Sequence, residues 1–255
     1  MTKIIQVDRS VIPACDVDLK TFERIVKETG DLEKIGAYKI PARSGRDGWE
    51  NWVRIARQHT NKPLIYDHQK AGTDIPDTGK DFMEDVRAAG FDAIILFPES
   101  GPVTEYEWIR AAQEVGLGVI VGGEMTHPRY LVGDYSEGKE KSYTEIFREL
   151  GFFEGLSGFI RATAPEDMYK LAAKMGVRDF VVPGNKPDRI KAHRSTIELA
   201  GARDAAFYSP GFVVQGGLIG DGARAAGDRF HAIVGRGIYQ ATDIRQAAVE
   251  HTSQI

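Results

Sequence analysis

The chain has 255 residues, of which 42% are hydrophobic and 27% are charged, and its formal net charge at pH 7 is −4. This composition is typical of a globular protein with a sizeable core, and it offers no basic surface for nucleic acid. The longest apolar runs, 93–97 and 118–121, are too short to cross a bilayer, and the N-terminus does not resemble a signal peptide. We therefore expect a cytoplasmic protein with no nucleic-acid or membrane partner.

Short apolar segments alternate with amphipathic segments along the whole chain. Eight segments are predicted strands: Val11–Asp16, Ala37–Pro41, Leu64–Tyr66, Ala93–Phe97, Gly118–Glu124, Phe180–Val182, Ala206–Ser209 and Ala232–Gly235. Helical periodicity lies between them, for example at 49–56 and 168–175, and Gly90, Gly116 and Gly176 stand where helices should end. Continuous apolar strands that alternate with helices indicate a parallel sheet covered on both faces. Eight such units predict an α/β fold of the (β/α)8 TIM-barrel type, in a single domain over residues 1–255.

One region interrupts this alternation. Residues 128–164 contain a charged stretch, then apolar residues at helical spacing in 143–150, and then a segment rich in glycine and aromatic residues. We interpret 128–164 as an elaborated connection after the fifth strand, on the active-site side of the barrel. It is expected to be either a mobile cover over the site or an added helix that packs on the barrel. Cys15, the only cysteine, is expected to be a small buried core residue.

Polar residues follow the predicted strands where the chemistry of a barrel is usually located. Asp16 ends the first strand, Lys39 lies in the second, and Asp67 and Lys70 follow the third. The fifth strand leads into Glu124-Met125-Thr126 and the sixth into Pro183-Gly184-Asn185. Any one of these residues has an ordinary structural explanation, such as a helix cap for Asp16 or a surface ion pair for Asp67 and Lys70. Together they predict a catalytic face.

The loops after the last two strands predict a phosphate site. Ser209-Pro210-Gly211 is followed by Gln215-Gly216-Gly217, and the eighth strand leads into Gly235-Arg236-Gly237. Glycines let backbone N–H groups approach an anion closely, and an arginine can bind phosphate oxygens in a bidentate manner. Phosphate sites of this fold are commonly built from these two loops.

These motifs resemble the orotidine 5′-phosphate decarboxylase family over most of the chain. The family has an Asp-x-Lys-x-x-Asp-Ile-Pro-x-x-Thr segment, a Glu-Met-Ser-His-Pro segment, a Ser-Pro-Gly…Gln-Gly-Gly loop and a final Val-Gly-Arg-x-Ile-Tyr. The counterparts here are Asp67…Lys70…Asp74-Ile75-Pro76-Asp77-Thr78, Glu124-Met125-Thr126-His127-Pro128, Ser209-Pro210-Gly211…Gln215-Gly216-Gly217 and Val234-Gly235-Arg236-Gly237-Ile238-Tyr239.

The resemblance implies metal-independent decarboxylation of orotidine 5′-monophosphate to uridine 5′-monophosphate, with no cofactor. It implies that Lys70 stabilises and protonates the C6 carbanion. Its catalytic charge set would be Lys70, Asp67, Asp74 and Lys39, and its substrate-binding set Asp16, Thr78, Thr126, Pro183, Gln215, Gly216, Gly217, Gly235 and Arg236. It also implies a homodimer in which Asp74 and Thr78 act in trans, in the site of the neighbouring subunit.

One departure from the family pattern concerns spacing. Two residues separate Asp67 from Lys70 and three separate Lys70 from Asp74, so this loop is two residues longer than the family pattern. His68 is expected to be part of the altered loop. Two alternatives stay open: a magnesium-dependent sugar-phosphate decarboxylase or synthase of the same superfamily, and a barrel that binds a phosphate ligand without catalysis. Those magnesium enzymes use carboxylates as metal ligands, including a Glu near strand two, where this chain has Lys39.

Overall fold

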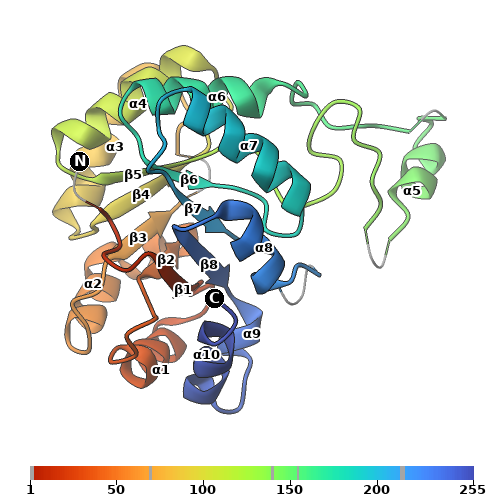
Figure 1. Cartoon of the computed structure of the whole chain (residues 1–255). Helices are drawn as coiled ribbons and strands as arrows, with labels where there is room; N and C mark the ends of the chain where they lie inside the picture. Colours follow the sequence, from red (N-terminus) through yellow and green to blue (C-terminus); the bar gives the residue numbers. More distant parts are fainter. Residues whose placement is uncertain (1–2, 69–70, 139–140, 154, 213–215) are drawn as a thin grey trace.

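The computed structural model describes residues 3–68, 71–138, 141–153, 155–212 and 216–255, and Figure 1 shows the arrangement of its elements. Eight parallel strands form one sheet in the order β1-β8-β7-β6-β5-β4-β3-β2. Their bounds are β1 Arg9–Pro13, β2 Tyr38–Pro41, β3 Leu64–Asp67, β4 Ala93–Leu96, β5 Gly118–Gly122, β6 Asp179–Val181, β7 Ala206–Ser209 and β8 Phe230–Val234. The predicted strands are confirmed, although β1 and β5 end before Asp16 and Glu124.

β1 and β2, which stand at the two ends of this order, are joined by isolated bridges that complete the barrel. Val11 pairs with Ile35 and Ala14 pairs with Lys39, both in parallel orientation. The Cys15 amide donates to the Lys39 carbonyl at 2.9 Å. A sheet closed in this way has side chains that alternate between the barrel interior and the outer helices. The predicted TIM barrel is confirmed.

Helices alternate with the strands and surround the sheet (Figure 1). The α-helices are α1 Leu19–Thr29, α2 Trp49–Arg57, α3 Gly79–Ala88, α4 Pro102–Glu114, α5 Tyr143–Glu149, α6 Ala164–Lys174, α7 Pro187–Leu199, α8 Ile219–Ala226, α9 Arg236–Tyr239 and α10 Ile244–Thr252, and the short 3-10 helices are η1 Ala42–Asp47 and η2 Pro76–Thr78. Gly90, Gly116 and Gly176 follow α3, α4 and α6 with positive φ angles of 98°, 75° and 89°. These are the helix ends predicted from the glycines.

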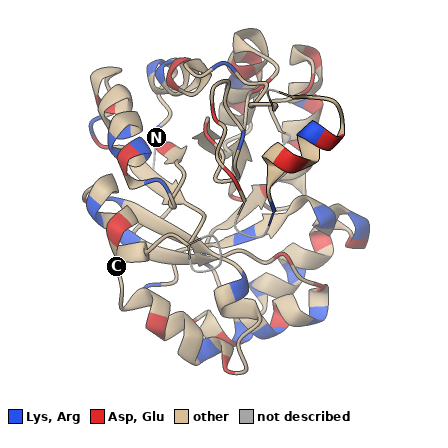
Figure 2. Ribbon diagram, turned by 90° about the vertical axis from the view of Figure 1, so that its right-hand side faces the viewer, with Lys and Arg blue, Asp and Glu red and all other residues tan. Residues whose placement is uncertain are grey.

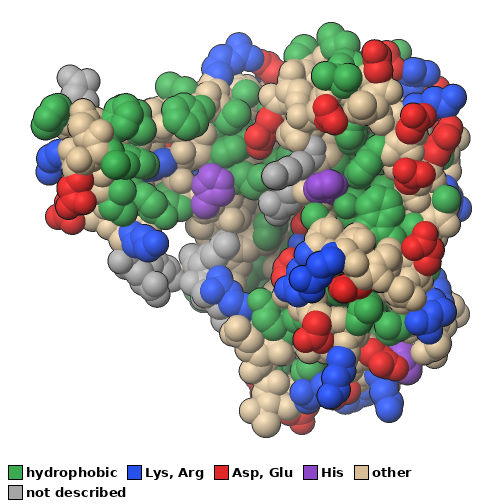
Figure 3. Space-filling view, turned by 180° about the vertical axis from the view of Figure 1, so that it is seen from behind, with side chains coloured by type: hydrophobic (Ala, Val, Ile, Leu, Met, Phe, Trp, Pro, Cys, Tyr) green, Lys and Arg blue, Asp and Glu red, His purple; other side chains and the backbone are tan. Residues whose placement is uncertain are grey.

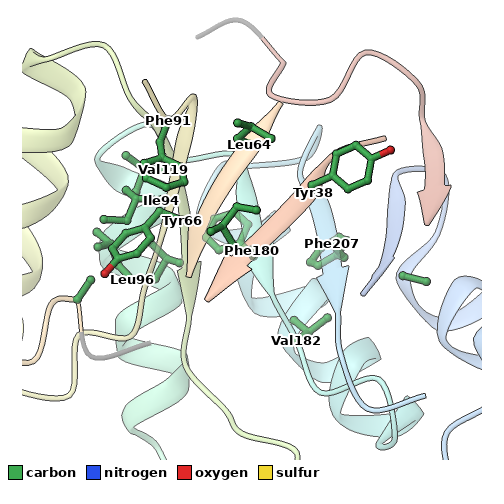
Figure 4. Packing of buried hydrophobic residues seen from close by; sticks show 14 of the residues in the cluster. Tyr38, Leu64, Tyr66, Phe91, Ile94, Leu96, Val119, Phe180, Val182 and Phe207 are labelled. Atoms are coloured by element: carbon green, nitrogen blue, oxygen red, sulfur yellow. The ribbon is translucent and has the colours of Figure 1, made fainter. Parts of the chain in front are cut away.

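Two apolar layers hold the barrel together. Tyr38, Leu64 and Tyr66 belong to the layer between the sheet and the helices, of which Figure 4 shows a part. Ile65 and Ile95 belong to a second, smaller cluster that includes inward-facing residues of the strands. This alternation follows from the two-residue period of a strand. Cys15 is fully buried in the outer layer, as predicted.

Residues 128–163, which we call the arm, extend from the barrel after β5. Figure 1 shows α5 standing apart from the barrel, and Figure 3 shows hydrophobic side chains on the projecting part. The base of the arm is a bridge between Leu131 and Ile160, with the Val132 amide donating to the Ile160 carbonyl at 2.7 Å. Arg129 donates to the Leu156 carbonyl at 2.6 Å and also binds Glu137. The arm therefore has its own internal contacts.

Charged residues are distributed over the outer helices with both signs intermixed (Figure 2). Many of them pair locally, as Arg110 does with Glu107 and Glu114 on α4. No helix in the described ranges is both long enough and apolar enough to span a membrane.

Candidate active site

A cavity of about 240 Å³ lies at the carboxyl end of the barrel. Its lining residues come from all eight strands or the loops that follow them, and its floor is apolar, with Ile95, Val181 and Ile233. Six residues predicted from the sequence line it: Asp16, Lys39, Asp67, Thr126, Gly235 and Arg236. A mostly apolar floor with convergent polar groups is typical of a small-molecule site.

A buried ion pair forms one wall of this cavity. Lys39 Nζ lies 2.5 Å from Asp67 Oδ2 and 3.9 Å from Asp16 Oδ2. Lys39 is 8% exposed and Asp67 is 6% exposed, so both charges are largely removed from water. Asp16 is half exposed at the rim. Burying two opposite charges is tolerated when they compensate one another at this distance.

The strand register explains how these two side chains meet. Lys39 pairs with Ile65, and Pro41 pairs with Asp67. Tyr38 and Ile40 contribute to the outer layer, so Lys39 lies on the interior face of β2, and by the same alternation Asp67 lies on the interior face of β3. Asp67 is one inward position further along the barrel, and the long lysine stem spans that step.

The electrostatic balance keeps Lys39 charged. Burial lowers the pKa of Lys39, but the nearby carboxylates of Asp67 and Asp16 outweigh burial, so the pKa is raised above its usual range. Within the described part of the chain, the buried Asp67 Oδ1 has no hydrogen-bond partner. The pair therefore presents at the cavity wall a charged ammonium and a carboxylate oxygen that no described residue binds.

Two predicted residues, Lys70 and Gln215, lie outside the described residues. Asp74 and Thr78, which follow Lys70, are exposed and are not among the residues that line the cavity. Thr78 Oγ1 donates to the Ile75 carbonyl at 2.9 Å, and the Ile75 amide donates to Asp74 Oδ1 at 2.7 Å. The Ile75 side chain is 59% exposed. This turn therefore presents polar and apolar groups outward from the chain's own cavity.

Another wall comes from the loops after β7 and β8. Pro210, Gly211 and Phe212 line the cavity together with Gly235 and the exposed Arg236. Gly216 and Gly217 are not among the lining residues of the described chain. Gly217 packs closely, since a Cβ there would lie 2.8 Å from the Gly211 carbonyl oxygen. The buried Pro183 also lies outside the lining.

Glu124, which the sequence placed on the catalytic face without a role of its own, is the centre of a charged cluster. Its buried carboxylate accepts from Lys186 Nζ at 3.1 Å and from Arg189 Nε at 2.7 Å, and it lies 2.7 Å from His193 Nε2. Burial raises the pKa of Glu124, but the bonds from His193 and Arg189 and the charge of Lys186 lower it to about 2. The spacing of these partners, i, i+3 and i+7, was a signal in the sequence for one helical face.

His68 lies beside the site. Its ring packs against Tyr66 and Phe82, and Tyr66 Oη lies 3.1 Å from His68 Nδ1. Burial raises the pKa of Tyr66, so the phenol is protonated and can donate this bond. His68 also lines a shallow cleft shared with Asp16, Lys39 and Asp67.

The comparison with protein families decides how this site is classified. The model described as "Orotidine 5'-phosphate decarboxylase / HUMPS family" matches residues 9–250. The chain belongs to this family. The resemblance inferred from the motifs is confirmed.

Relatives named orotidine 5′-phosphate decarboxylase align with this chain over most of their length. An orotidine 5′-phosphate decarboxylase of Methanosarcina mazei is 31% identical over 230 residues, which cover 90% of this chain and 86% of the relative. One of Methanococcus maripaludis is 29% identical over 246 residues, which cover 95% of each protein.

Solved structures of the family have the same fold. The orotidine 5′-monophosphate decarboxylase of Methanocaldococcus jannaschii, complexed with the inhibitor BMP, superposes with a TM-score of 0.75 at 23% identity, over 96% of this chain and 98% of that one. The enzyme of Pyrococcus horikoshii gives a TM-score of 0.71 at 25% identity, with the same coverage.

Proposed function

We propose that this member of the orotidine 5′-phosphate decarboxylase / HUMPS family is a carboxy-lyase that converts orotidine 5′-monophosphate to uridine 5′-monophosphate in pyrimidine biosynthesis. The observation that carries the proposal is the Lys39–Asp67 pair, which is buried in a cavity that is also lined by the arginine-bearing loop after β8. Such a cavity suits a ligand with a charge-sensitive reacting end and a phosphate.

In the reaction, the bond between C6 of the pyrimidine and its carboxylate breaks, and carbon dioxide leaves. The electron pair remains at C6, where no adjacent π system delocalises it. An ammonium beside C6 stabilises this charge and then donates its proton to C6, which completes the product. We assign this role to Lys70. Solvent returns the proton to Lys70 after each turnover. Lys39 compensates the buried negative charge of Asp67.

The remaining predicted residues divide the substrate between them. Asp16 at the rim would contact the ribose and Thr126 the pyrimidine. We assign the phosphate to Arg236, Gly235, Gly216, Gly217 and Gln215, and a packing role beneath the substrate to Pro183. Phosphate binding energy, remote from C6, can contribute to the transition state.

We further propose that two copies form a homodimer in which Asp74 and Thr78 complete the partner's site. In support, Asp74 and Thr78 are exposed beside the exposed Ile75 rather than lining their own cavity. Symmetric dimers of this kind are the commonest protein assemblies. We also propose that residues 1–255 act as one catalytic domain and that the protein works in the cytoplasm.

The magnesium-dependent alternative requires carboxylates at the strand ends that are not already paired with a cationic side chain. Here the ammonium of Lys39 already lies 2.5 Å from Asp67, and it would repel a divalent cation. The non-catalytic alternative rests on the longer loop between Asp67 and Asp74.

A decarboxylation assay without added metal tests the proposal against both alternatives. We expect the loss of orotidylate absorbance to proceed at the same rate with and without a chelator. Loss of turnover in chelator would favour a metal enzyme. Calorimetric binding of uridine 5′-monophosphate without turnover of orotidylate would establish a binding protein.

A further inference from the structure

We propose that Glu124, held by Lys186, Arg189 and His193, is a positioning residue for pyrimidine recognition. It fixes the backbone of Met125 and Thr126, so that Thr126 faces the cavity. This inference rests on the proposed function, because it concerns recognition of the base of the same nucleotide.

The first observation is that one carboxylate connects β5 to the start of α7. Glu124 is 3% exposed. One of its partners, Lys186, directly precedes α7, and the other two, Arg189 and His193, lie in the first two turns of that helix. Arg189 and His193 both meet Oε2, and Lys186 meets Oε1. Charge-assisted bonds to a buried carboxylate are strong and directional, so the cluster holds the two elements at a fixed separation.

The second observation is that the same segment also holds the backbone after Glu124. Lys186 Nζ donates to the Met125 carbonyl at 3.2 Å, and Asn185 Nδ2 donates to the Thr126 carbonyl at 3.0 Å. Met125 and Thr126 line the cavity, as Glu124 does. The Met125 carbonyl is therefore held by Lys186, which Glu124 also binds, and the Thr126 carbonyl is held by the neighbouring residue Asn185.

A purely structural role is weakened by a separate connection between β5 and β6. Tyr169 Oη accepts from the Gly123 amide at 3.1 Å and donates to the Val181 carbonyl at 2.7 Å. This bridge does not use the Glu124 carboxylate, so these strands stay connected when the carboxylate is neutralised. Among the described contacts, the Thr126 carbonyl is held by Asn185, which directly precedes the Glu124 partner Lys186 in the chain.

The test is Glu124→Gln, with calorimetric binding of uridine 5′-monophosphate and of ribose 5-phosphate. The amide keeps the shape but loses the charge that orients Lys186 and Arg189. We expect affinity for uridine 5′-monophosphate to fall by roughly tenfold or more, because the hydroxyl for the base is misplaced. Affinity for ribose 5-phosphate, which lacks the base, should stay within about twofold. KM for orotidylate should rise more than kcat falls.

The matched control is Glu198→Gln, which removes a carboxylate on the same helix whose partner, Arg194, lies near the surface. It should leave both affinities unchanged. If Glu124→Gln does not fold, Asn185→Ala removes only the bond to Thr126 and should give the same base-specific loss. Unchanged affinity for uridine 5′-monophosphate, or equal losses for both ligands, would overturn the inference. Failure of the unmodified protein to bind uridine 5′-monophosphate would instead reject the proposed function.

Discussion

Lys39 Nζ and Asp67 Oδ2 lie 2.5 Å apart inside the barrel, on neighbouring strands and away from water. Removal of the ammonium by Lys39→Met leaves a buried carboxylate without its compensating charge, which should lower the free energy of unfolding by about 3 kcal/mol. Decarboxylase activity should fall as well. Urea denaturation checks the first effect. The control Arg110→Gln, which breaks two pairs on the surface of α4, should cost less than about 1 kcal/mol. Equal, small effects of both substitutions would contradict the importance of the buried pair.

Lys70→Ala tests the proton donor. Loss of a positioned general acid typically costs about 10²- to 10⁴-fold in rate, and here the same group also stabilises the carbanion. We therefore expect kcat for orotidylate to drop by at least about 10²-fold. Lys80→Ala, which removes an exposed lysine on α3, is the control. Activity of Lys70→Ala within about tenfold of the unmodified protein would remove Lys70 from its role.

Mixing two inactive variants tests whether Asp74 acts in trans. Lys70→Ala and Asp74→Ala should each be nearly inactive as homodimers. After random reassociation, half of the dimers are mixed and each holds one intact site, so about a quarter of the activity should return. Lys70→Ala mixed with the Lys70→Ala/Asp74→Ala double variant should recover nothing. Differently tagged subunits verify exchange, and mixed dimers without recovered activity would place Asp74 in its own subunit's site.

Arg236→Ala tests the phosphate site. The guanidinium is exposed at the cavity, and its loss should raise KM for orotidylate by roughly tenfold or more, because charge-assisted bonds to the phosphate are removed. Turnover of orotidine, which lacks the phosphate, should be unaffected. Arg224→Ala on α8 is the surface control. An unchanged KM, or equal losses for both substrates, would argue against phosphate binding by Arg236.

The lowered pKa of Glu124 predicts how the free energy of unfolding changes at acidic pH. Its pKa is about 2 in the folded protein, against an ordinary value of 4.5, because His193, Arg189 and Lys186 favour the charged form. A lowered pKa stabilises the fold above pH 4.5, and this contribution is lost as the pH falls towards 2. Its size is on the order of 3 kcal/mol. The stability difference between the unmodified protein and Glu124→Gln should therefore shrink across this interval in urea titrations. A constant difference would mean that Glu124 is not held in its charged form.

Most of the barrel could be predicted because its signals are local. The alternation of strands and helices and the glycines after α3, α4 and α6 are properties of short segments. The position of Lys39 at the cavity was also accessible, since Tyr38 and Ile40 are apolar neighbours and side chains alternate along a strand. The arm was recognised as an interruption, but its extension away from the barrel was not, because Arg129 and its partners lie up to 27 residues apart.

The cluster at Glu124 shows the limit of prediction from one sequence. The glutamate stood in a recognised motif, and its three partners share helical spacing. Yet these contacts join residues that are 62 to 69 positions apart, and sequence periodicity does not predict contacts at such separations.

The sequence by itself determined the number and order of the barrel elements, the family, and the charged residues at the strand ends. Local periodicity and motif spacing carry that information. Only the tertiary structure decided that Lys39 meets Asp67, that Asp74 and Thr78 lie outside the cavity of their own chain, and that Glu124 joins β5 to α7. These relationships depend on strand register and barrel closure, which bring distant charges within hydrogen-bond distance.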